Sequence, residues 1–519
     1  MPFLARLVSL LLFGAAIAFS PKAVAALSVH APFSDGAVLQ RDRAVVIRGD
    51  ADPGAQIHVR LGDETISTHA DTEGRWQIIA GAHPAWTRLD ADIRSASEHI
   101  EVRDLLFGDV WLASGQSNIA WTINKSADAE LHKADADQPA LRFVAIPTTI
   151  ADTPRRSLTA NWFASSPETI GDISAISYHF GRRIQSETGV PVGIILGIWG
   201  GTWIESWIPH EVLAADPDFS PAFERWQGVL DAHPAARARY EVALRDWLEA
   251  YRANGNQPPP GHPRPEAPRG PGHPHQPASV FNGLVHPLAG TPLRGVIWYQ
   301  GESNTRRAWI YRRLLPAMIN SWRELWDDPV LPFVVAQLPR YGRPAAFDAD
   351  SEWAALRESQ RIAVDQTPHT ALAVLIDTGE PDQIHPSDKL TPGIRIADTA
   401  LASVYGRADI PLSGPRLRCA RAEDAEFVLE FSAARNALRT SDSAAPRGFV
   451  IAGEDRVWRP DSARLAGASL RLSHPEVPRP VAARYAWAGF PDGNLTDATG
   501  LPAEPFRTDV WPGPTDDRR

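Results

Sequence analysis

An apolar run, Val110 to Ala113, ends abruptly in the polar segment Ser-Gly-Gln-Ser-Asn of residues 114–118. The run predicts a buried strand, and the polar segment predicts a tight turn that leads into a helix. Open α/β sheets place reactive groups at the carboxyl ends of their strands. A serine in such a turn exposes its hydroxyl, and the backbone N–H groups that follow are free to stabilise an oxyanion. We therefore predict an α/β sheet with Ser117 as a nucleophile.

Strand-like and helix-like segments alternate from about residue 104 to residue 405, which predicts a parallel sheet flanked by helices. The helical segment 352–366 is the clearest, because its apolar residues and Gln360 share one face. Predicted strands span 109–113, 192–199, 294–299, 332–338 and 371–376, and predicted helices span 172–187, 307–327, 352–366 and 390–405.

Regions of β character flank this alternation. Short runs at 44–48, 56–60 and 76–79, separated by Gly-containing turns, are typical of a small antiparallel sandwich. Residues 411–507 return to β character. We predict a signal peptide at 1–25, an N-terminal β domain at 26–103, an α/β domain at 104–410 with a helical and Pro-rich insertion at 210–280, and a C-terminal β domain at 411–510.

The amino terminus is typical of a secretory signal peptide. Arg6 is followed by an apolar run from Leu7 to Phe19 and then by the small residues Ala23-Val-Ala25. The run is too short to span a bilayer as a stable anchor, so an uncleaved anchor is the less favoured alternative. Cys419 is the only cysteine, so no intrachain disulfide can form, and we expect this residue to pack within a strand. A signal peptide on a chain that cannot form an intrachain disulfide indicates a bacterial periplasmic or secreted protein. We expect no membrane attachment after cleavage.

The net charge of −10 and the lack of a Lys/Arg cluster argue against nucleic-acid binding. The oligomeric state is left open by the sequence. Residues 257–277 are rich in Pro and contain His262, His273 and His275. Because the prolines make the histidine spacing irregular, we favour a semi-rigid extended segment over a metal site.

A serine nucleophile needs a base, and the base needs a group that orients it. His385 is the candidate base, since it lies in a Pro-flanked loop after the last predicted strand of the sheet. Asp382, three residues earlier, is close enough in the chain to accept a hydrogen bond from the ring. Glu302, in the loop after the strand 294–299, is the alternative orienter.

The loop 377–386 also allows two other interpretations. One is an Asx-type turn beside a surface histidine. The other is a metal site formed by Asp377, Glu380, Asp382 and His385, which is less favoured because no other well-placed His or Cys accompanies them. We predict no metal and no cofactor.

Two further loops follow predicted strands and are expected at the same edge of the sheet. In the first, Gly201 can bring a backbone N–H close to a ligand, because glycine has no side chain. In the second, Gln300 or Asn304 could complete an oxyanion hole with the amides of Ser117 and Gly201. Each loop alone is typical of an ordinary turn, but polar loops at four strand ends together indicate an active site.

Five segments resemble the sialate O-acetylesterase family, a group of SGNH-type carbohydrate esterases. The resemblance runs from about residue 27 to Gly493-Asn-Leu495. Ile119 and Ala120 stand where the family commonly has Met and Glu, and Ala113 often corresponds to Cys, but no reacting group is lost. The segments are Gly108-Asp-Val-Trp-Leu-Ala-Ser-Gly-Gln-Ser-Asn118, Trp199-Gly-Gly-Thr-Trp-Ile-Glu-Ser-Trp207, Phe281-Asn-Gly-Leu284, Gly295-Val-Ile-Trp-Tyr-Gln-Gly-Glu-Ser-Asn304 and Ile384-His-Pro386.

The resemblance implies an SGNH-hydrolase-like sheet, a triad of Ser117, His385 and Asp382, and an oxyanion hole formed by the Ser117 amide, Gly201 and a residue of the loop 300–304. It also implies a serine esterase that removes O-acetyl groups from carbohydrates through an acetyl-enzyme.

The substrate stays open, because members of the family also act on acetylated plant polysaccharides. We favour acetylated xylan or xyloglucan, which suits a bacterial envelope enzyme, over O-acetylated sialic acids. A sialate site needs a positive group, for which Arg306, Arg307 and Arg340 are candidates. The alternative of another class is a non-catalytic carbohydrate-binding protein.

Overall fold

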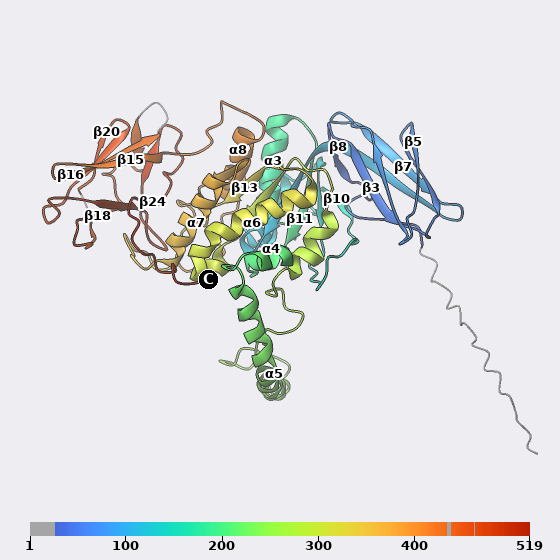
Figure 1. Cartoon of the computed structure of the whole chain (residues 1–519), viewed down its shortest axis with the longest axis horizontal. Coiled ribbons are helices and arrows are strands. Elements are labelled where there is room, and N and C mark those ends of the chain that lie inside the picture. The colour runs from blue at the N-terminus through green and yellow to red at the C-terminus, as the bar shows by residue number, and fades with distance from the viewer. Residues whose placement is uncertain (1–25, 433–436, 461) are drawn as a thin grey trace, which may run out of the picture.

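The computed structural model describes residues 26–432, 437–460 and 462–519. The predicted signal peptide, residues 1–25, lies outside these described residues. Within them, no helix is both long enough and apolar enough to cross a bilayer. Figure 1 shows two β regions on either side of a central α/β body, and one long helix that projects from that body.

The central body is built on a sheet in the order β10-β9-β11-β8-β12-β13-β14. Neighbouring strands run parallel, except for β9 and β10. Every residue of β12 and β13 is buried, as expected for parallel strands covered on both faces. The strands are β8 (His99–Gly115), β9 (Gln138–Ala145), β10 (Trp162–Ser165), β11 (Val192–Ile198), β12 (Gly295–Tyr299), β13 (Phe333–Ala336) and β14 (Thr370–Ala373).

Two pairs of helices pack on this sheet, α3 with α8 and α6 with α7 (Figure 1). On α7, Leu356, Gln360 and Ala363 are fully buried and form the predicted inner face. The predicted α/β class, with a sheet flanked by helices and β regions at both ends, is confirmed. The helices are α1 (Ser117–Ala120), α2 (Ala129–Ala134), α3 (Ala175–Thr188), α4 (His210–Ala215), α5 (Pro221–Ala253), α6 (Ala308–Trp326), α7 (Glu352–Gln366) and α8 (Leu390–Ser403).

Strands β9 and β10 are not predicted by the sequence pattern. Pro139 and Arg142 interrupt the apolar run of β9. Arg142 is nevertheless buried, because its guanidinium donates hydrogen bonds to the carbonyl groups of Gly36 and Asp104. A buried charge that is paired in this way cannot be foreseen from a local pattern.

The N-terminal region consists of two sheets that enclose a common apolar core, which includes Ile47, Ile57 and Ile93. One sheet is β1-β3-β6, and the other joins the central sheet through the 17-residue strand β8. The predicted domain boundary at 103/104 therefore falls inside one continuous strand. The strands are β1 (Ser28–Val29), β2 (Val38–Gln40), β3 (Val45–Asp50), β4 (Gln56–Leu61), β5 (Glu64–His69), β6 (Arg75–Ala80) and β7 (Arg88–Arg94).

The C-terminal region has its own apolar core between two four-stranded sheets and one strand pair. Cys419 lies on β15 but is exposed, so its predicted packing is wrong. The pairing of β15 with β16 is irregular between Leu417 and Cys419, and Arg418 and Cys419 both face solvent there. The strands are β15 (Arg416–Glu423), β16 (Glu426–Ser432), β17 (Leu438–Thr440), β18 (Phe449–Ala452), β19 (Arg459–Pro460), β20 (Arg464–Ala466), β21 (Ser469–Leu472), β22 (Ala482–Tyr485), β23 (Leu495–Asp497) and β24 (Phe506–Arg507).

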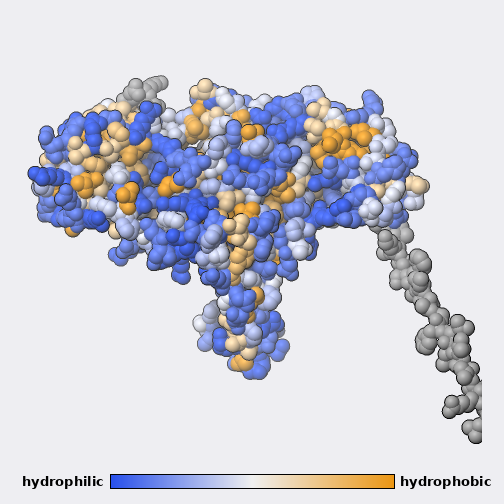
Figure 2. Space-filling view, in the orientation of Figure 1, coloured by the Kyte–Doolittle hydropathy of each residue, from blue (hydrophilic) through white to orange (hydrophobic). Residues whose placement is uncertain are grey.

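The insertion 210–280 contains α4, α5 and an extended Pro-rich segment. The 33-residue helix α5 projects from the body, and apolar residues run along its visible face (Figures 1 and 2). Past Trp226, no residue of α5 is buried. The Pro-rich segment runs back along the helix, where the Trp247 indole donates a hydrogen bond to the His262 carbonyl.

Candidate active site

Ser117 and His385 meet at the carboxyl edge of the central sheet. Ser117 begins α1 directly after β8, and His385 lies in the loop between β14 and α8. The Nε2 atom of His385 lies 2.7 Å from the Ser117 hydroxyl oxygen, although the two residues are 268 positions apart in the chain. This is the distance at which a base can take the proton of a hydroxyl nucleophile.

The turn before Ser117 depends on glycine. Gly115 has a φ of +133°, and a Cβ atom there would lie 2.1 Å from the Tyr299 carbonyl oxygen. Only glycine allows the end of β8 to approach β12 this closely in that conformation. The next residue, Gln116, donates its N–H to the same carbonyl at 3.0 Å. These contacts place the Ser117 hydroxyl at the edge of the sheet.

Trp121 stacks on His385, with ring centroids 4.6 Å apart and planes inclined by 16°. Burial, together with the positive charges of Lys389 and Lys125, lowers the pKa of His385 below its usual value. The ring is therefore neutral at neutral pH, as a general base must be. Trp121 is not among the predicted site residues, and its one signal in the sequence is its position four residues after the candidate serine.

The expected contact between Asp382 and His385 is not formed. Asp382 is exposed, and no hydrogen bond or ion pair of its carboxylate is present within the described residues. A three-residue spacing places both residues in one loop, but it does not decide the direction of the Asp382 side chain. The ring contact that His385 makes is with Trp121.

Asn118 connects three parts of the site behind the serine. Its Nδ2 donates to Glu302 Oε1 at 2.6 Å and to the Ile384 carbonyl at 2.9 Å, and its Oδ1 accepts from Lys389 Nζ at 2.8 Å. Glu302 therefore reaches the loop of His385 through Asn118 and makes no hydrogen bond with the ring. Burial raises the pKa of Glu302 to about 7 and lowers the pKa of Lys389 to about 8.

Gln300 and Asn304 do not serve the serine as the sequence predicts. Gln300 Nε2 donates to the Thr202 carbonyl at 3.1 Å and to Asn304 Oδ1 at 2.7 Å, so both of its N–H groups are used. Asn304 Nδ2 donates to Glu205 at 2.9 Å, and both amide side chains are fully buried. The geometry contradicts their predicted role as oxyanion donors, because buried amides are satisfied by interior partners.

Glu205 is the centre of this interior network and is not among the predicted site residues. Its carboxylate accepts hydrogen bonds from Arg225 at 3.0 Å and from Arg307 at 2.9 Å. Burial opposes ionisation, but the two arginines keep the pKa of Glu205 below its usual value. Arg307 is thus already paired, whereas Arg306 is exposed and the Arg340 guanidinium lies 4.5 Å from the Phe490 ring centroid.

Gly200 lies against Ser117. A Cβ atom on Gly200 would be 3.3 Å from the Ser117 Cβ, whereas one on Gly201 would meet no atom within 4 Å. The backbone N–H groups of Ser117 and Gly200 have no hydrogen-bond partner within the described residues. The Gly200–Gly201 turn therefore lies beside the serine, with Gly200 against the Ser117 side chain.

The metal interpretations do not fit the geometry. Asp377 pairs with Arg395, and Glu380 accepts hydrogen bonds from the N–H and hydroxyl of Ser387. Among the described residues, the four side chains of the alternative metal site do not bring their ligand atoms together. On the Pro-rich segment, the rings of His273 and His275 are in edge contact, and His262 is exposed.

Comparisons with known proteins show which enzymes this chain is similar to. A family model described as carbohydrate esterase, sialic acid-specific acetylesterase, matches residues 282–401, which contain the loop 300–304 and His385. The sialate O-acetylesterase of Homo sapiens is 28% identical over 420 residues, 73% of this chain and 71% of that protein. The enzyme of the same name from Mus musculus is 28% identical over 417 residues, 73% of each chain.

A solved structure extends the similarity to nearly the whole chain. The crystal structure of a carbohydrate acetylesterase from Xanthomonas citri is 33% identical, with a TM-score of 0.79 over 94% of this chain and 100% of that chain. The alternative of a non-catalytic carbohydrate-binding protein is therefore not supported. Similarity over that full length, in a fold whose sheet edge carries the serine and histidine pair, shows that the chain belongs to the sialate O-acetylesterase family and is a carbohydrate O-acetylesterase.

Proposed function

We propose that Ser117 and His385 hydrolyse a carbohydrate O-acetyl ester through an acetyl-enzyme. His385 Nε2 takes the hydroxyl proton as the Ser117 oxygen attacks the acetyl carbonyl carbon. The sugar hydroxyl leaves with that proton, and water activated by the same histidine then releases acetate. The observation that carries the proposal is the 2.7 Å separation between His385 Nε2 and the Ser117 hydroxyl.

The negative oxygen that develops during attack needs N–H donors. We expect them to be the Ser117 amide and an amide of the Gly200–Gly201 turn, because Gly200 lies against Ser117 and both the Ser117 and Gly200 amides lack a partner within the described residues. Loss of one such donor lowers kcat by roughly 10²–10³. No side chain of the loop 300–304 is needed for this role.

Asp382 remains the proposed orienter of His385, on the ground of its place three residues earlier in the same loop. Catalytic hydrogen bonds are often long or misaligned before the substrate is bound. A rotation of the exposed Asp382 side chain toward Nδ1 would complete a triad. The stacking of Trp121 on the His385 ring needs no such rotation.

A serine-directed phosphonate tests the nucleophile. We expect stoichiometric labelling of wild type at Ser117, located by peptide mass spectrometry, and no labelling of Ser117→Ala. Ser303→Ala, a change to another serine at the edge of the sheet, is the matched control and should label like wild type. Activity should survive dialysis against EDTA. Absence of labelling in the folded wild-type protein would overturn the proposal.

For the substrate we propose acetylated plant xylan or xyloglucan, with O-acetylated sialic acid as the second candidate. One observation favours the second. The Lys125 ammonium lies 5.4 Å from the Trp121 ring centroid, and the Arg269 guanidinium lies 5.2 Å from that of Trp203. Both cations are exposed, and neither forms an ion pair within the described residues, so either is free to bind a sugar carboxylate.

Acetate release decides between the two substrates. It is measured side by side from acetylated xylan or xyloglucan oligosaccharides and from an O-acetylated sialic acid, with wild type, Lys125→Gln and Arg269→Gln. If the sialate ester is preferred and the two variants raise KM for it alone, the plant-polysaccharide assignment is wrong. A preference for the neutral oligosaccharides, unchanged in both variants, supports it.

We also propose export to a bacterial periplasm or medium with removal of residues 1–25, and a mature chain divided into 26–103, 104–410 and 411–510. Edman sequencing of the exported protein should begin near residue 26. A mature chain that still begins at Met1 would overturn the cleavage proposal.

A further inference from the structure

The Pro-rich segment, residues 257–277, returns from the tip of α5 to the Gly200–Gly201 turn, which lies against Ser117. Near its end, His275 Nε2 lies 2.6 Å from the Gly201 carbonyl oxygen. The His275 ring also stacks on Trp203, with centroids 4.1 Å apart and planes inclined by 21°. An insertion that extends far from the sheet therefore contributes one side chain to the edge of the active site.

The protonation state of His275 follows from this contact. A carbonyl oxygen can only accept a hydrogen bond, so Nε2 carries the proton and Nδ1 does not. The side chain is buried, with 7% of its surface exposed, and its Nδ1 has no partner within the described residues. Burial lowers the pKa of His275 to about 4, so the ring is neutral over the range in which an esterase is assayed.

Gly201 has little else to fix it. Its φ is +73°, it is exposed, and a Cβ atom there would meet nothing within 4 Å. The flanking residues are fixed by other bonds: the Thr202 hydroxyl donates to the Trp199 carbonyl at 2.9 Å, and Gln300 donates to the Thr202 carbonyl at 3.1 Å. The His275 bond is thus the contact that sets the orientation of the Gly201 carbonyl itself.

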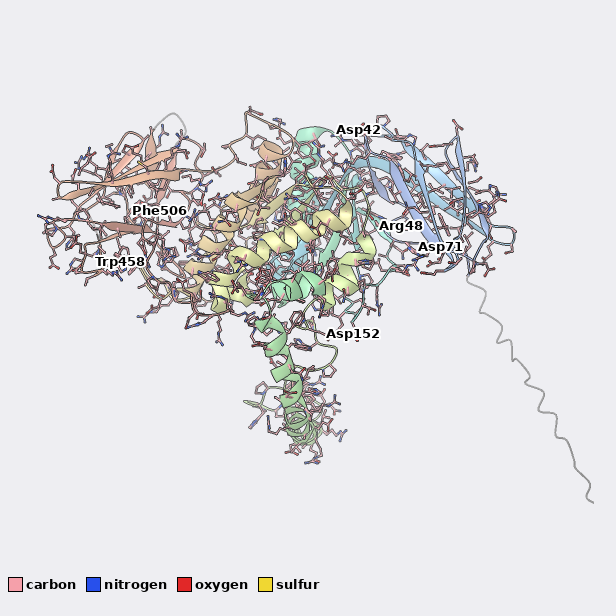
Figure 3. The ribbon with its side chains drawn as sticks, viewed as in Figure 1. Asp42, Arg48, Asp71, Asp152, Trp458 and Phe506 are labelled. Atoms are coloured by element: carbon pink, nitrogen blue, oxygen red, sulfur yellow. The ribbon has the colours of Figure 1, made fainter. Side chains whose placement is uncertain are left out.

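The segment around His275 is firmly attached to the body. The neighbouring Gln276 donates to Asp152 at 2.8 Å, and Asp152 is labelled in Figure 3. Ala278 donates its N–H to the Glu205 carbonyl at 3.1 Å. These bonds hold the His275 imidazole on the Gly200–Gly201 turn, and they do not involve the tip of α5.

We propose that His275 is a positioning residue for ester hydrolysis, which fixes the Gly200–Gly201 turn so that its amides face the oxygen of the reacting acetyl group. The inference rests on the proposed Ser117 mechanism. The Gly201 carbonyl shares its planar peptide unit with the Thr202 N–H. Fixing that unit limits the rotation about the Cα–C bond of Gly201, and so limits the positions open to the Gly201 and Gly200 amides just before it. An unfixed glycine turn samples many conformations, and donors must be placed before the charge develops.

The test compares His275→Gln, His275→Asn and His275→Leu in the full-length protein. The Gln amide nitrogen can occupy the place of Nε2, whereas the Asn nitrogen reaches only the place of Nδ1. His262→Leu, on the exposed part of the same segment, is the matched control. The readouts are kcat and KM on p-nitrophenyl acetate, the rate of Ser117 phosphonylation, and the thermal midpoint, with Ser117→Ala as the blank.

We expect Asn and Leu to lower kcat about 10- to 100-fold with KM changed about two-fold at most, because a misplaced donor affects the transition state and not binding. Phosphonylation should slow in parallel, Gln should retain most activity, and His262→Leu should match wild type. If His275→Leu does not fold, the Gln and Asn pair decides.

The inference is overturned if all three folded variants are as active as wild type. It is also overturned if His275→Gln and His275→Asn lose the same factor in kcat and that loss follows their thermal midpoints. Wild-type hydrolysis that Ser117→Ala leaves intact overturns the proposed mechanism and, with it, this inference. Ser117-dependent hydrolysis that is insensitive to His275 overturns the inference alone.

Discussion

The loops that follow β12 and β14 are both rich in polar residues, but they lie in different environments. In the loop 300–304, the side chains of Gln300 and Asn304 are fully buried and bonded to interior groups. The loop 377–389 is partly exposed and brings His385 to 2.7 Å from Ser117. One loop therefore supports the site, and the other supplies a reacting group.

The difference shows that a place at a strand end does not make a side chain reactive. A reacting group needs a free polar atom on the substrate side, whereas a supporting group uses its polar atoms in the interior. Glu302 lies between these cases, since one oxygen accepts from Asn118 and the other is buried without a partner in the described part of the chain. Four predictions test this contrast.

The largest effect is expected from His385→Ala. Without its base, the Ser117 hydroxyl is a poor nucleophile near neutral pH, and kcat on a simple acetyl ester should fall by roughly 10⁴–10⁶. The thermal midpoint should stay close to that of wild type, because His385 is only partly buried. The exposed His69→Ala is the control, and a His385→Ala protein that keeps most of its activity would contradict the assignment.

The next largest effect is expected from Asp382→Asn, and the loss of kcat in Glu302→Gln should be smaller. If Asp382 orients His385, Asp382→Asn lowers kcat by up to ~10⁴. Glu302→Gln should lower it only about 10-fold, since a neutral amide oxygen can still accept the bond from Asn118. Steady-state kinetics of both single variants and the double variant measure this. An active Asp382→Asn beside an inactive Glu302→Gln would assign the orienting role to Glu302.

Gln300→Leu should affect stability more than chemistry. It removes the hydrogen bonds that the Gln300 side chain donates to the Thr202 carbonyl and to Asn304 Oδ1, both in the interior. We expect a loss of roughly 2–4 kcal/mol in the free energy of unfolding, and a loss in kcat of about 10-fold or less. Urea unfolding and kinetics measure both, with the exposed Gln257→Leu as control. A fall in kcat of roughly 10²–10³ at unchanged stability would restore the oxyanion role.

The smallest effect is expected from Lys125→Gln. The positive charge of Lys125 disfavours protonation of His385, so its removal should raise the pKa of that ring. Activity requires the neutral ring, and the acid limb of the kcat/KM profile should therefore move to higher pH, most clearly at low salt.

Lys133→Gln is the control, because Lys133 pairs with Glu130 instead. A limb that stays in place at low salt, or moves to lower pH, would show that Lys125 does not act on His385.

Much of the central fold could be predicted, because its cues are local. The apolar runs of β11 and β12 and the one-sided face of α7 are periodic patterns that need no distant partner. Strand β9 could not be predicted, since the buried Arg142 depends there on distant acceptors, the Gly36 and Asp104 carbonyls and the Asp104 carboxylate. The sequence pattern also could not predict that β8 is one strand shared by two sheets, because a long strand and two short ones show the same pattern.

The sequence by itself determined the α/β class, the turn at Ser117 and the candidacy of His385, because strand ends, glycine turns and residue chemistry are local properties. Only the tertiary structure decided that Gln300 and Asn304 face the interior, that Asp382 points to solvent, and that Trp121 stacks on His385. It also decided that His275 bonds to Gly201 across 74 positions of chain. The direction of a side chain depends on which distant groups compete for its polar atoms, and that competition exists only in the folded chain.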